Sequence, residues 1–120
     1  MENVGRDPET NVGAMHGPGY SGSSPLSATY RLAGGYATAF HVFALEWEQN
    51  VARFYVDDTL FQTRTPADLA ARGGNLRWVY DHPFSIILNI AVGGGFPGNP
   101  NASTPFPQTL AIDYVRVYAR

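Results

Sequence analysis

The stretch that most constrains the fold is Pro83–Gly98, which contains the longest apolar run in the chain. Residues 85–92 (SIILNIAV) are interrupted by one strongly polar residue, Asn89, and a triple glycine, Gly93–Gly95, follows them. A short run rich in β-branched and large apolar side chains, bounded by proline and glycine, is typical of a buried strand. The pattern therefore predicts a central β-strand over residues 85–92, covered on both faces.

The two faces of this predicted strand differ in character. Period-2 alternation places only bulky side chains on one face, namely Ile86, Leu88, Ile90 and Val92. The opposite face becomes smaller and more polar towards its end, as in a strand whose face opens onto a groove. The amide of Asn89 could bind a ligand's hydroxyl groups there, or it could satisfy the backbone of a neighbouring loop.

Shorter strand and turn patterns occupy the rest of the chain. Segments rich in β-formers predict strands at residues 11–17, 40–47, 51–56, 60–64 and 110–118. A tight turn at residues 57–59 predicts a hairpin, and residues 65–74 predict the one helix. Thr65 can cap this helix, Pro66 suits its first position and Gly73 can end it. The patterns together indicate an all-β protein, an antiparallel β-sandwich with one short helix.

The charge and composition of the chain exclude several classes of partner and site. The net charge is -2 and no basic cluster occurs, which argues against nucleic acid. No apolar run approaches the ~20 residues needed to span a membrane. The sequence shows no basic region followed by an apolar region, so we expect no signal peptide. Cysteine is absent, which excludes disulfides and thiolate metal sites, and 120 residues suffice for one domain at most.

Several blocks, taken in order, resemble glycoside hydrolase family 16 and are most similar to its bacterial laminarinases, the endo-β-1,3-glucanases. The blocks are residues 15–22 (MHGPGYSG), 40–47 (FHVFALEW), 53–58 (RFYVDD), 87–94 (ILNIAVGG) and 113–118 (DYVRVY). The resemblance covers nearly the whole chain. It implies a jelly-roll, concanavalin A-like β-sandwich in which a concave sheet forms the substrate cleft.

The resemblance also implies a catalytic residue. The family's signature strand has the form Glu-x-Asp-x-x-Glu, in which the first Glu is the nucleophile and the last is the general acid/base. Residues 1–5 (MENVG) resemble the end of this signature, so Glu2 is implied as the acid/base. From the sequence alone, Glu2 is a solvated carboxylate near a terminus. The nucleophile would precede Met1, so we expect residues 1–120 to be the C-terminal part of a single sandwich domain, truncated and inactive by itself.

Three further positions match functional positions of the family. His16 matches a cleft histidine that could bind a sugar hydroxyl or the acid/base carboxylate, although a surface loop histidine would look the same. Phe96 lies where laminarinases often carry a stacking tryptophan, and it could equally pack under its own loop. Asp113 matches a ligand of a structural calcium, whose other ligands would come from outside this chain. The resemblance implies no cofactor for the chemistry itself.

Two functions remain open. The first is an endo-β-1,3-glucanase that cleaves β-glucan by the retaining double-displacement mechanism, extracellular in the case of the parent enzyme. The second is a non-catalytic, lectin-like sandwich that binds β-glucan through His16, Asn89 and Phe96. The upstream Glu-x-Asp in the parent reading frame would discriminate between them.

Part of a jelly roll leaves unpaired strand edges and half-covered apolar faces, which favour association with other chains. We therefore expect the isolated chain to be dimeric or prone to aggregation. Light scattering from the purified chain measures this directly, and a monomer that unfolds cooperatively would contradict the expectation.

Overall fold

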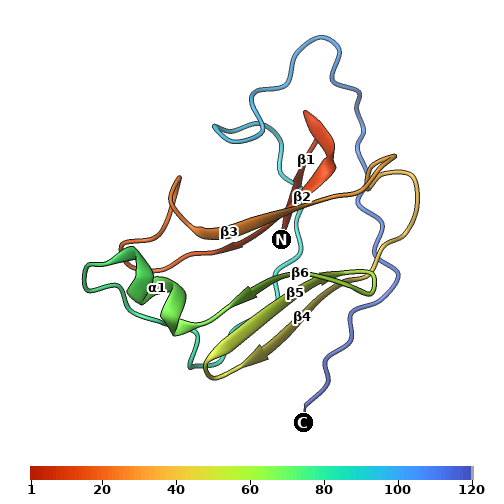
Figure 1. The fold of residues 1–120 in the computed structure, drawn as a ribbon. Helices are drawn as coiled ribbons and strands as arrows, with labels where there is room; N and C mark the ends of the chain where they lie inside the picture. The colour runs from red at the N-terminus through yellow and green to blue at the C-terminus, as the bar shows by residue number, and fades with distance from the viewer. Residues whose placement is uncertain (120) are drawn as a thin grey trace. The chain divides into compact units, whose positions relative to one another are not determined.

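The computed structural model describes residues 1–119. The chain divides into two compact units, Met1–Pro83 and Phe84–Arg120, which are described separately. The first unit carries all the regular structure of the described residues (Figure 1). Its elements are the strands β1 (Glu2–Val4), β2 (Asp7–Met15), β3 (Leu26–Arg31), β4 (Phe43–Glu48), β5 (Val51–Val56) and β6 (Thr59–Arg64), and the helix α1 (Pro66–Arg72).

Two antiparallel, three-stranded sheets form the first unit. Their strand orders are β1-β2-β3 and β4-β5-β6, so every strand pairs with its neighbour in sequence. Figure 1 shows the sheets as two layers with α1 at one end. The prediction of an all-β antiparallel sandwich with one short helix is confirmed.

The interior lies between the facing sides of β2 and β6. Gly13 of β2 is buried there, and a Cβ atom added to it would lie 2.7 Å from Gln62 Oε1 and 3.0 Å from Phe61 Cε2. The ring centroid of Phe61 lies 5.8 Å from that of Tyr30 and 6.3 Å from that of Phe54. Side chains of β6 therefore lie close against the bare backbone of β2 at Gly13.

Two amides are enclosed in the same interior. Asn11 is 1% exposed and Gln62 is 4% exposed. Asn11 Nδ2, Gln62 Nε2 and Gln62 Oε1 have no hydrogen-bond partner among the described residues. Buried polar groups without partners are costly, so these amides offset part of the stabilisation that the surrounding apolar side chains provide.

The predicted hairpin forms, with β5 and β6 joined at a tight turn. Asp57 in this turn has φ 51°, the left-handed conformation that aspartate tolerates better than most residues. Its carboxylate accepts a hydrogen bond from the Val42 N–H at 3.0 Å and contacts His41 Nδ1 at 3.1 Å. The turn is thereby tied to the residues that lead into β4.

We expect this tie to weaken in acid. The hydrogen bond from the Val42 N–H, and then that with His41, lower the pKa of Asp57. A lowered folded pKa gives stability that is complete above the unfolded value of about 3.9 and is lost as pH falls through the folded pKa. Asp57→Asn should therefore lose stability at pH 7 and show a smaller loss on acidification than the wild type. Urea unfolding at neutral and acidic pH measures both.

Asp58→Asn is the matched control, because Asp58 makes no hydrogen bond or ion pair within residues 1–119. Asparagine also tolerates the left-handed backbone at position 57, so the substitution tests the charge and not the turn. Equal acid sensitivity of the two variants would contradict the assignment.

Helix α1 forms where it was predicted. The Thr65 backbone N–H donates to Asp68 Oδ2 at 2.7 Å and the Thr65 hydroxyl donates to the same oxygen at 3.2 Å. Gly73 follows the last turn with φ 74°, which favours glycine. The helix buries Leu69, which is 2% exposed.

The second unit contains no helix or strand among its described residues, 84–119. The predictions of a central strand at residues 85–92 and of a last strand at 110–118 are therefore wrong for this structure. Ile87 is 80% exposed and Val117 is 77% exposed, so the expected coverage of the two segments is absent as well. A strand persists through hydrogen bonds to a neighbouring strand, and neither segment pairs with another within the described residues.

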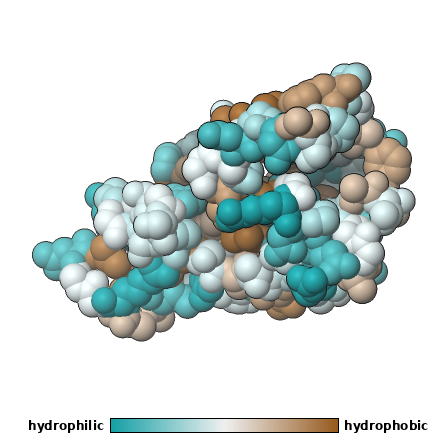
Figure 2. All heavy atoms as spheres, turned by 90° about the horizontal axis from the view of Figure 1, so that it is seen from above, coloured by the Kyte–Doolittle hydropathy of each residue, from teal (hydrophilic) through white to brown (hydrophobic). Residues whose placement is uncertain are grey.

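Hydrophobic side chains thus reach the surface in both units. In Figure 2 hydrophobic residues are visible at the surface between hydrophilic ones. In the first unit Phe43, Leu45 and Trp47 of β4 are each more than 40% exposed, and β4 is an edge strand of its sheet. Among residues 1–119, no helix has the length and apolar character needed to cross a bilayer.

Candidate functional site

The short strand β1 holds Glu2 on the outward face of its sheet. In the antiparallel pair of β1 and β2, Glu2 lies opposite Val12. Directly opposed residues point to the same side of a sheet. Asn11, Gly13 and Met15 are buried on the inner side, so Glu2 and Val12 lie on the other side, which we call the outer face. Glu2 itself is exposed there.

The outer face of β2 and β3 is built from small and polar side chains. The paired residues on it are Thr10 with Arg31, Val12 with Thr29, and Ala14 with Ser27. Ser27, Thr29 and Arg31 are exposed and alternate with the buried or half-buried side of β3. Glu2 thus lies among small and polar side chains on this face.

Asn3 fixes the position of β1 on β2. The pairing register shifts between Asn3 and Val4, as at a β-bulge. At this irregularity the Asn3 side-chain amide donates to the carbonyl oxygens of Pro8 at 3.1 Å and of Thr10 at 2.8 Å. Bulges often re-aim a side chain near a functional site. Asn3 thus holds the strand that carries Glu2, although β1 is only three residues long.

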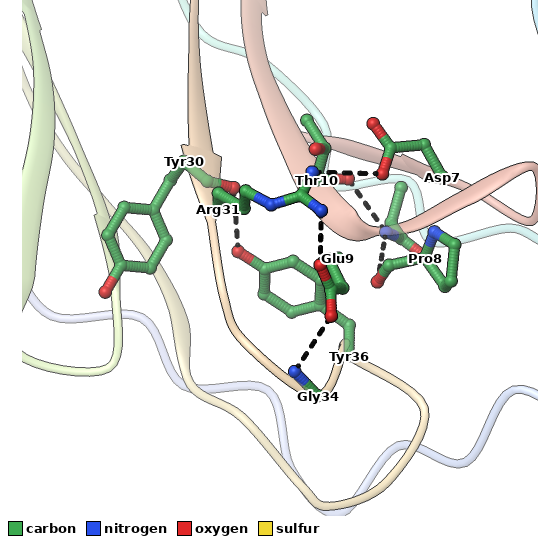
Figure 3. A network of polar contacts seen from close by, with 9 residues as sticks. Asp7, Pro8, Glu9, Thr10, Tyr30, Arg31, Gly34 and Tyr36 are labelled. Atoms are coloured by element: carbon green, nitrogen blue, oxygen red, sulfur yellow. Dashed lines mark hydrogen bonds and ion pairs between the residues drawn. The ribbon is translucent and has the colours of Figure 1, made fainter.

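Asp7, Glu9 and Arg31 form a charged network near the β-bulge at Asn3 (Figure 3). Arg31 contacts Glu9 Oε2 through Nη2 at 2.5 Å and Asp7 Oδ1 through Nη1 at 3.6 Å. The other oxygen of Glu9 accepts a hydrogen bond from the Gly34 N–H at 3.2 Å. Asp7 and Glu9 are therefore engaged with Arg31, whereas Glu2 has no ion pair within the described residues.

His16 follows the last residue of β2 and continues its alternation, so it belongs to the outer face and is exposed. It lies four residues beyond Val12, about 14 Å at 3.4 Å per residue. Glu2 and His16 therefore share one face at different positions along it. This separation favours contact of His16 with a sugar hydroxyl over a hydrogen bond to the Glu2 carboxylate.

Two tyrosines join the loop after His16 to the segment around Tyr80. The Tyr80 hydroxyl donates to the His16 carbonyl oxygen at 2.5 Å, and the Tyr20 hydroxyl donates to the Arg77 carbonyl oxygen at 3.0 Å. Burial, followed by hydrogen bonding with Tyr20, raises the pKa of Tyr80, so its hydroxyl remains a donor. The loop after His16 and the segment around Tyr80 are thus joined by two hydrogen bonds, with one tyrosine hydroxyl donated from each segment.

Three predicted site residues lie in the second unit. Asn89 and Asp113 are exposed, and Phe96 is 47% exposed. Phe96 sits in a turn that the Gly98 N–H closes on the Gly94 carbonyl oxygen at 3.0 Å. The positive φ angles of Gly94 and Gly98, 111° and 86°, explain why glycine flanks this turn. The roles of these three residues stay predictions.

A calcium ion requires six to eight oxygen ligands. No group of three or more histidine, cysteine, aspartate or glutamate side chains that could hold a metal occurs in residues 1–119. Asp113 by itself offers two carboxylate oxygens. The residues that the structure brings together thus do not form the calcium site that the resemblance implies.

Asn3 and Tyr80 were not identified from the sequence as residues that shape the site, whereas the loop around Tyr20 was interpreted as either a linker-like excursion or one wall of a site. Tyr80 lies 64 residues from His16. No spacing or motif links two residues so far apart in the chain, so only the fold could reveal the contact. For Asn3, the position next to Glu2 was the one available signal.

The fold and these positions define an antiparallel β-sandwich with a carboxyl group, Glu2, and an imidazole, His16, on one exposed sheet face. The chain belongs to the glycosyl hydrolases family 16, which it matches over residues 1–116.

Named relatives and solved structures agree with this membership. The chain is 37% identical to a β-glucanase of Rhodothermus marinus, over 98% of this chain and 42% of the relative. An endo-β-1,3-glucanase structure from Pyrococcus furiosus matches with a TM-score of 0.80 and 44% identity, over 87% of this chain and 40% of that one. A β-1,3-glucan-binding protein of Penaeus monodon is 38% identical, over 68% of this chain and 27% of the relative. The chain thus spans well under half of these proteins.

Proposed function

We propose that this chain acts on β-1,3-glucan as part of an endo-β-1,3-glucanase, with Glu2 as the general acid/base. The observation that carries the proposal is the exposed Glu2 on the outer face, held opposite Val12 among small side chains. The similarity to the Pyrococcus furiosus endo-β-1,3-glucanase supports the substrate class.

In this proposal Glu2 protonates the glycosidic oxygen as the leaving sugar departs. After cleavage its carboxylate takes a proton from the water that releases the second product. His16 binds a sugar hydroxyl farther along the same face. Asn89 would contribute an amide to the sugar hydroxyls, and Phe96 a ring for stacking on a sugar face.

The retaining mechanism needs a second carboxyl group about 5–5.5 Å from the first. Asp7 and Glu9 are bound to Arg31, so neither is proposed for this role. We propose that the nucleophile comes from the portion of the family signature that precedes Glu2. The reaction uses two carboxyl groups and needs no cofactor.

The alternative is a non-catalytic β-glucan-binding sandwich. The similarity to the Penaeus monodon β-1,3-glucan-binding protein favours it, and so does the single unpaired carboxylate on the outer face. In this case Glu2 would serve only as a hydrogen-bond acceptor for sugar hydroxyls.

Hydrolysis and binding of laminarin separate the two functions. We would compare this chain with the longest reading frame that contains it, each with Glu or Gln at position 2. Products are followed by chromatography, and binding by the retardation of the protein in gels that contain laminarin. Whichever of the two proteins hydrolyses laminarin, we expect Glu2→Gln to abolish its hydrolysis. The same substitution should leave its binding of laminarin intact.

An aryl glucoside with a dinitrophenolate leaving group provides the control, because this leaving group needs no protonation. Glu2→Gln should still release the dinitrophenolate in the first step. Loss of that step as well would contradict the acid/base role. Binding without hydrolysis in the longer protein would favour the glucan-binding function.

A further inference from the structure

His16 emerges directly from the end of β2, at a point where the chain makes a tight turn. Gly17 and Tyr20 close this turn through two backbone hydrogen bonds, at 3.3 Å and 3.0 Å. The Tyr20 ring is fully buried beneath it. The far side of the turn is thus anchored in the core, whereas the His16 side chain is exposed to solvent.

The near side of the turn is anchored by Tyr80. Its hydroxyl donates to the His16 carbonyl oxygen at 2.5 Å. The carbonyl and the side chain of His16 are attached through the same Cα atom. Fixing the direction of the carbonyl therefore restricts the backbone rotation that would otherwise swing the imidazole across the outer face.

Tyr80 is itself held firmly enough to act as an anchor. Its ring packs edge-on against Trp78, with centroids 5.0 Å apart and an interplanar angle of 73°. Its carbonyl oxygen accepts a hydrogen bond from Trp47 Nε1 at 2.8 Å, and Trp78 Nε1 donates to the Gln49 carbonyl oxygen at 2.9 Å. The first bond ties Tyr80 to β4, and the second ties Trp78, against which the Tyr80 ring packs, to the residue after β4. The ring that carries the hydroxyl is therefore held in place.

We infer that Tyr80 is a positioning residue, whose hydroxyl holds the His16 backbone so that the imidazole meets a sugar hydroxyl on the outer face. The inference rests on the proposed function for the role of His16. Tyr80 itself touches no substrate in this account.

Tyr80→Phe keeps the ring and removes the hydroxyl, and with it both the hydrogen bond to the His16 carbonyl and the hydrogen bonding with Tyr20. The matched control is Tyr36→Phe, because the Tyr36 hydroxyl also donates to a backbone carbonyl, that of Tyr30, at 3.1 Å. Both tyrosines are half-buried. The two variants should therefore lose similar stability, whereas only Tyr80→Phe should affect His16.

The first readout is the NMR signal of the His16 imidazole in the 120-residue chain, assigned with His16→Ala. The second is the affinity for laminarihexaose, a β-1,3-linked hexasaccharide. We expect Tyr80→Phe to shift the imidazole signals and to weaken binding about 3- to 10-fold, the range expected for one hydrogen bond. Tyr36→Phe should leave both unchanged.

Unchanged imidazole signals in Tyr80→Phe would overturn the inference, whatever the effect of His16→Ala. Equal shifts in Tyr36→Phe would also overturn it, because the effect would then be general loosening. If His16→Ala binds laminarihexaose like the wild type while Tyr80→Phe still shifts the imidazole, Tyr80 positions His16 but the proposed sugar-binding role of His16 fails.

Discussion

Tyr20→Ala is expected to destabilise the first unit by about 3–5 kcal/mol, the cost of truncating a large buried aromatic side chain. Tyr20 is 0% exposed and belongs to the core cluster that contains Met15, Leu26 and Leu69. Its hydroxyl also satisfies the Arg77 carbonyl oxygen. The substitution would therefore create a cavity and leave an acceptor without its partner. Such a loss is a large part of the 5–15 kcal/mol that stabilises a typical domain.

Urea unfolding followed by the fluorescence of Trp47 and Trp78 measures the effect. Tyr20→Phe is the control, since it removes only the hydroxyl and should cost about 0.5–1.5 kcal/mol. If the alanine variant lost no more stability than the phenylalanine variant, the ring would not be the packing anchor of this corner.

Gly17→Ala is expected to cost about 3 kcal/mol, the upper end of the range for overpacking a filled site. A Cβ atom at position 17 would lie 2.3 Å from both Cζ and the hydroxyl oxygen of Tyr20. The Tyr20 ring is stiff, fully buried and hydrogen-bonded to the Arg77 carbonyl, so it has no room to withdraw. The turn that carries His16 would have to open instead.

Gly5→Ala is the matched control, because a Cβ atom at Gly5 would meet no atom within 4 Å. Gly5 also has no positive φ, so alanine fits its backbone. This variant should range from unchanged to about 1 kcal/mol more stable, through the lower entropy of its unfolded chain. The same denaturation experiment serves both, and equal stability of the two variants would show that the close approach of Gly17 to Tyr20 is relaxed in solution.

Local chemistry made part of the fold predictable. The hairpin of β5 and β6 depends on a turn between adjacent strands, and α1 depends on Thr65, Pro66 and Gly73 within one short segment. These elements appear where the sequence predicted them, because the residues that determine them are neighbours in the chain.

The wrong strand predictions concern segments whose structure depends on distant partners. Residues 85–92 have the apolar, β-branched character of a central strand, but they pair with no strand among residues 1–119. An apolar pattern shows that a segment prefers burial. It does not supply the neighbouring strand on which the backbone hydrogen bonds depend.

In the candidate site, too, some residues could be found from a local motif and others only from contacts in the folded chain. A motif pointed to Glu2 and His16, and strand pairing then places both on the outer face. Asn3 and Tyr80 act through hydrogen bonds to backbone carbonyls, which any residue type can provide. The acceptor side of such a contact leaves no trace in the sequence, so these supports become visible only in the folded chain.

Because Gly13 has no side chain, its place in β2 limits where residues can be inserted or deleted in proteins of this kind. Gln62 and Phe61 fill the space that a side chain at position 13 would need. Deleting or inserting one residue within β2 would bring Val12 or Ala14 to this contact and exchange the two faces of the strand. We therefore expect evolutionary insertions and deletions to avoid β2 and to accumulate in the loop of residues 21–25, where extra residues change no pairing between the strands.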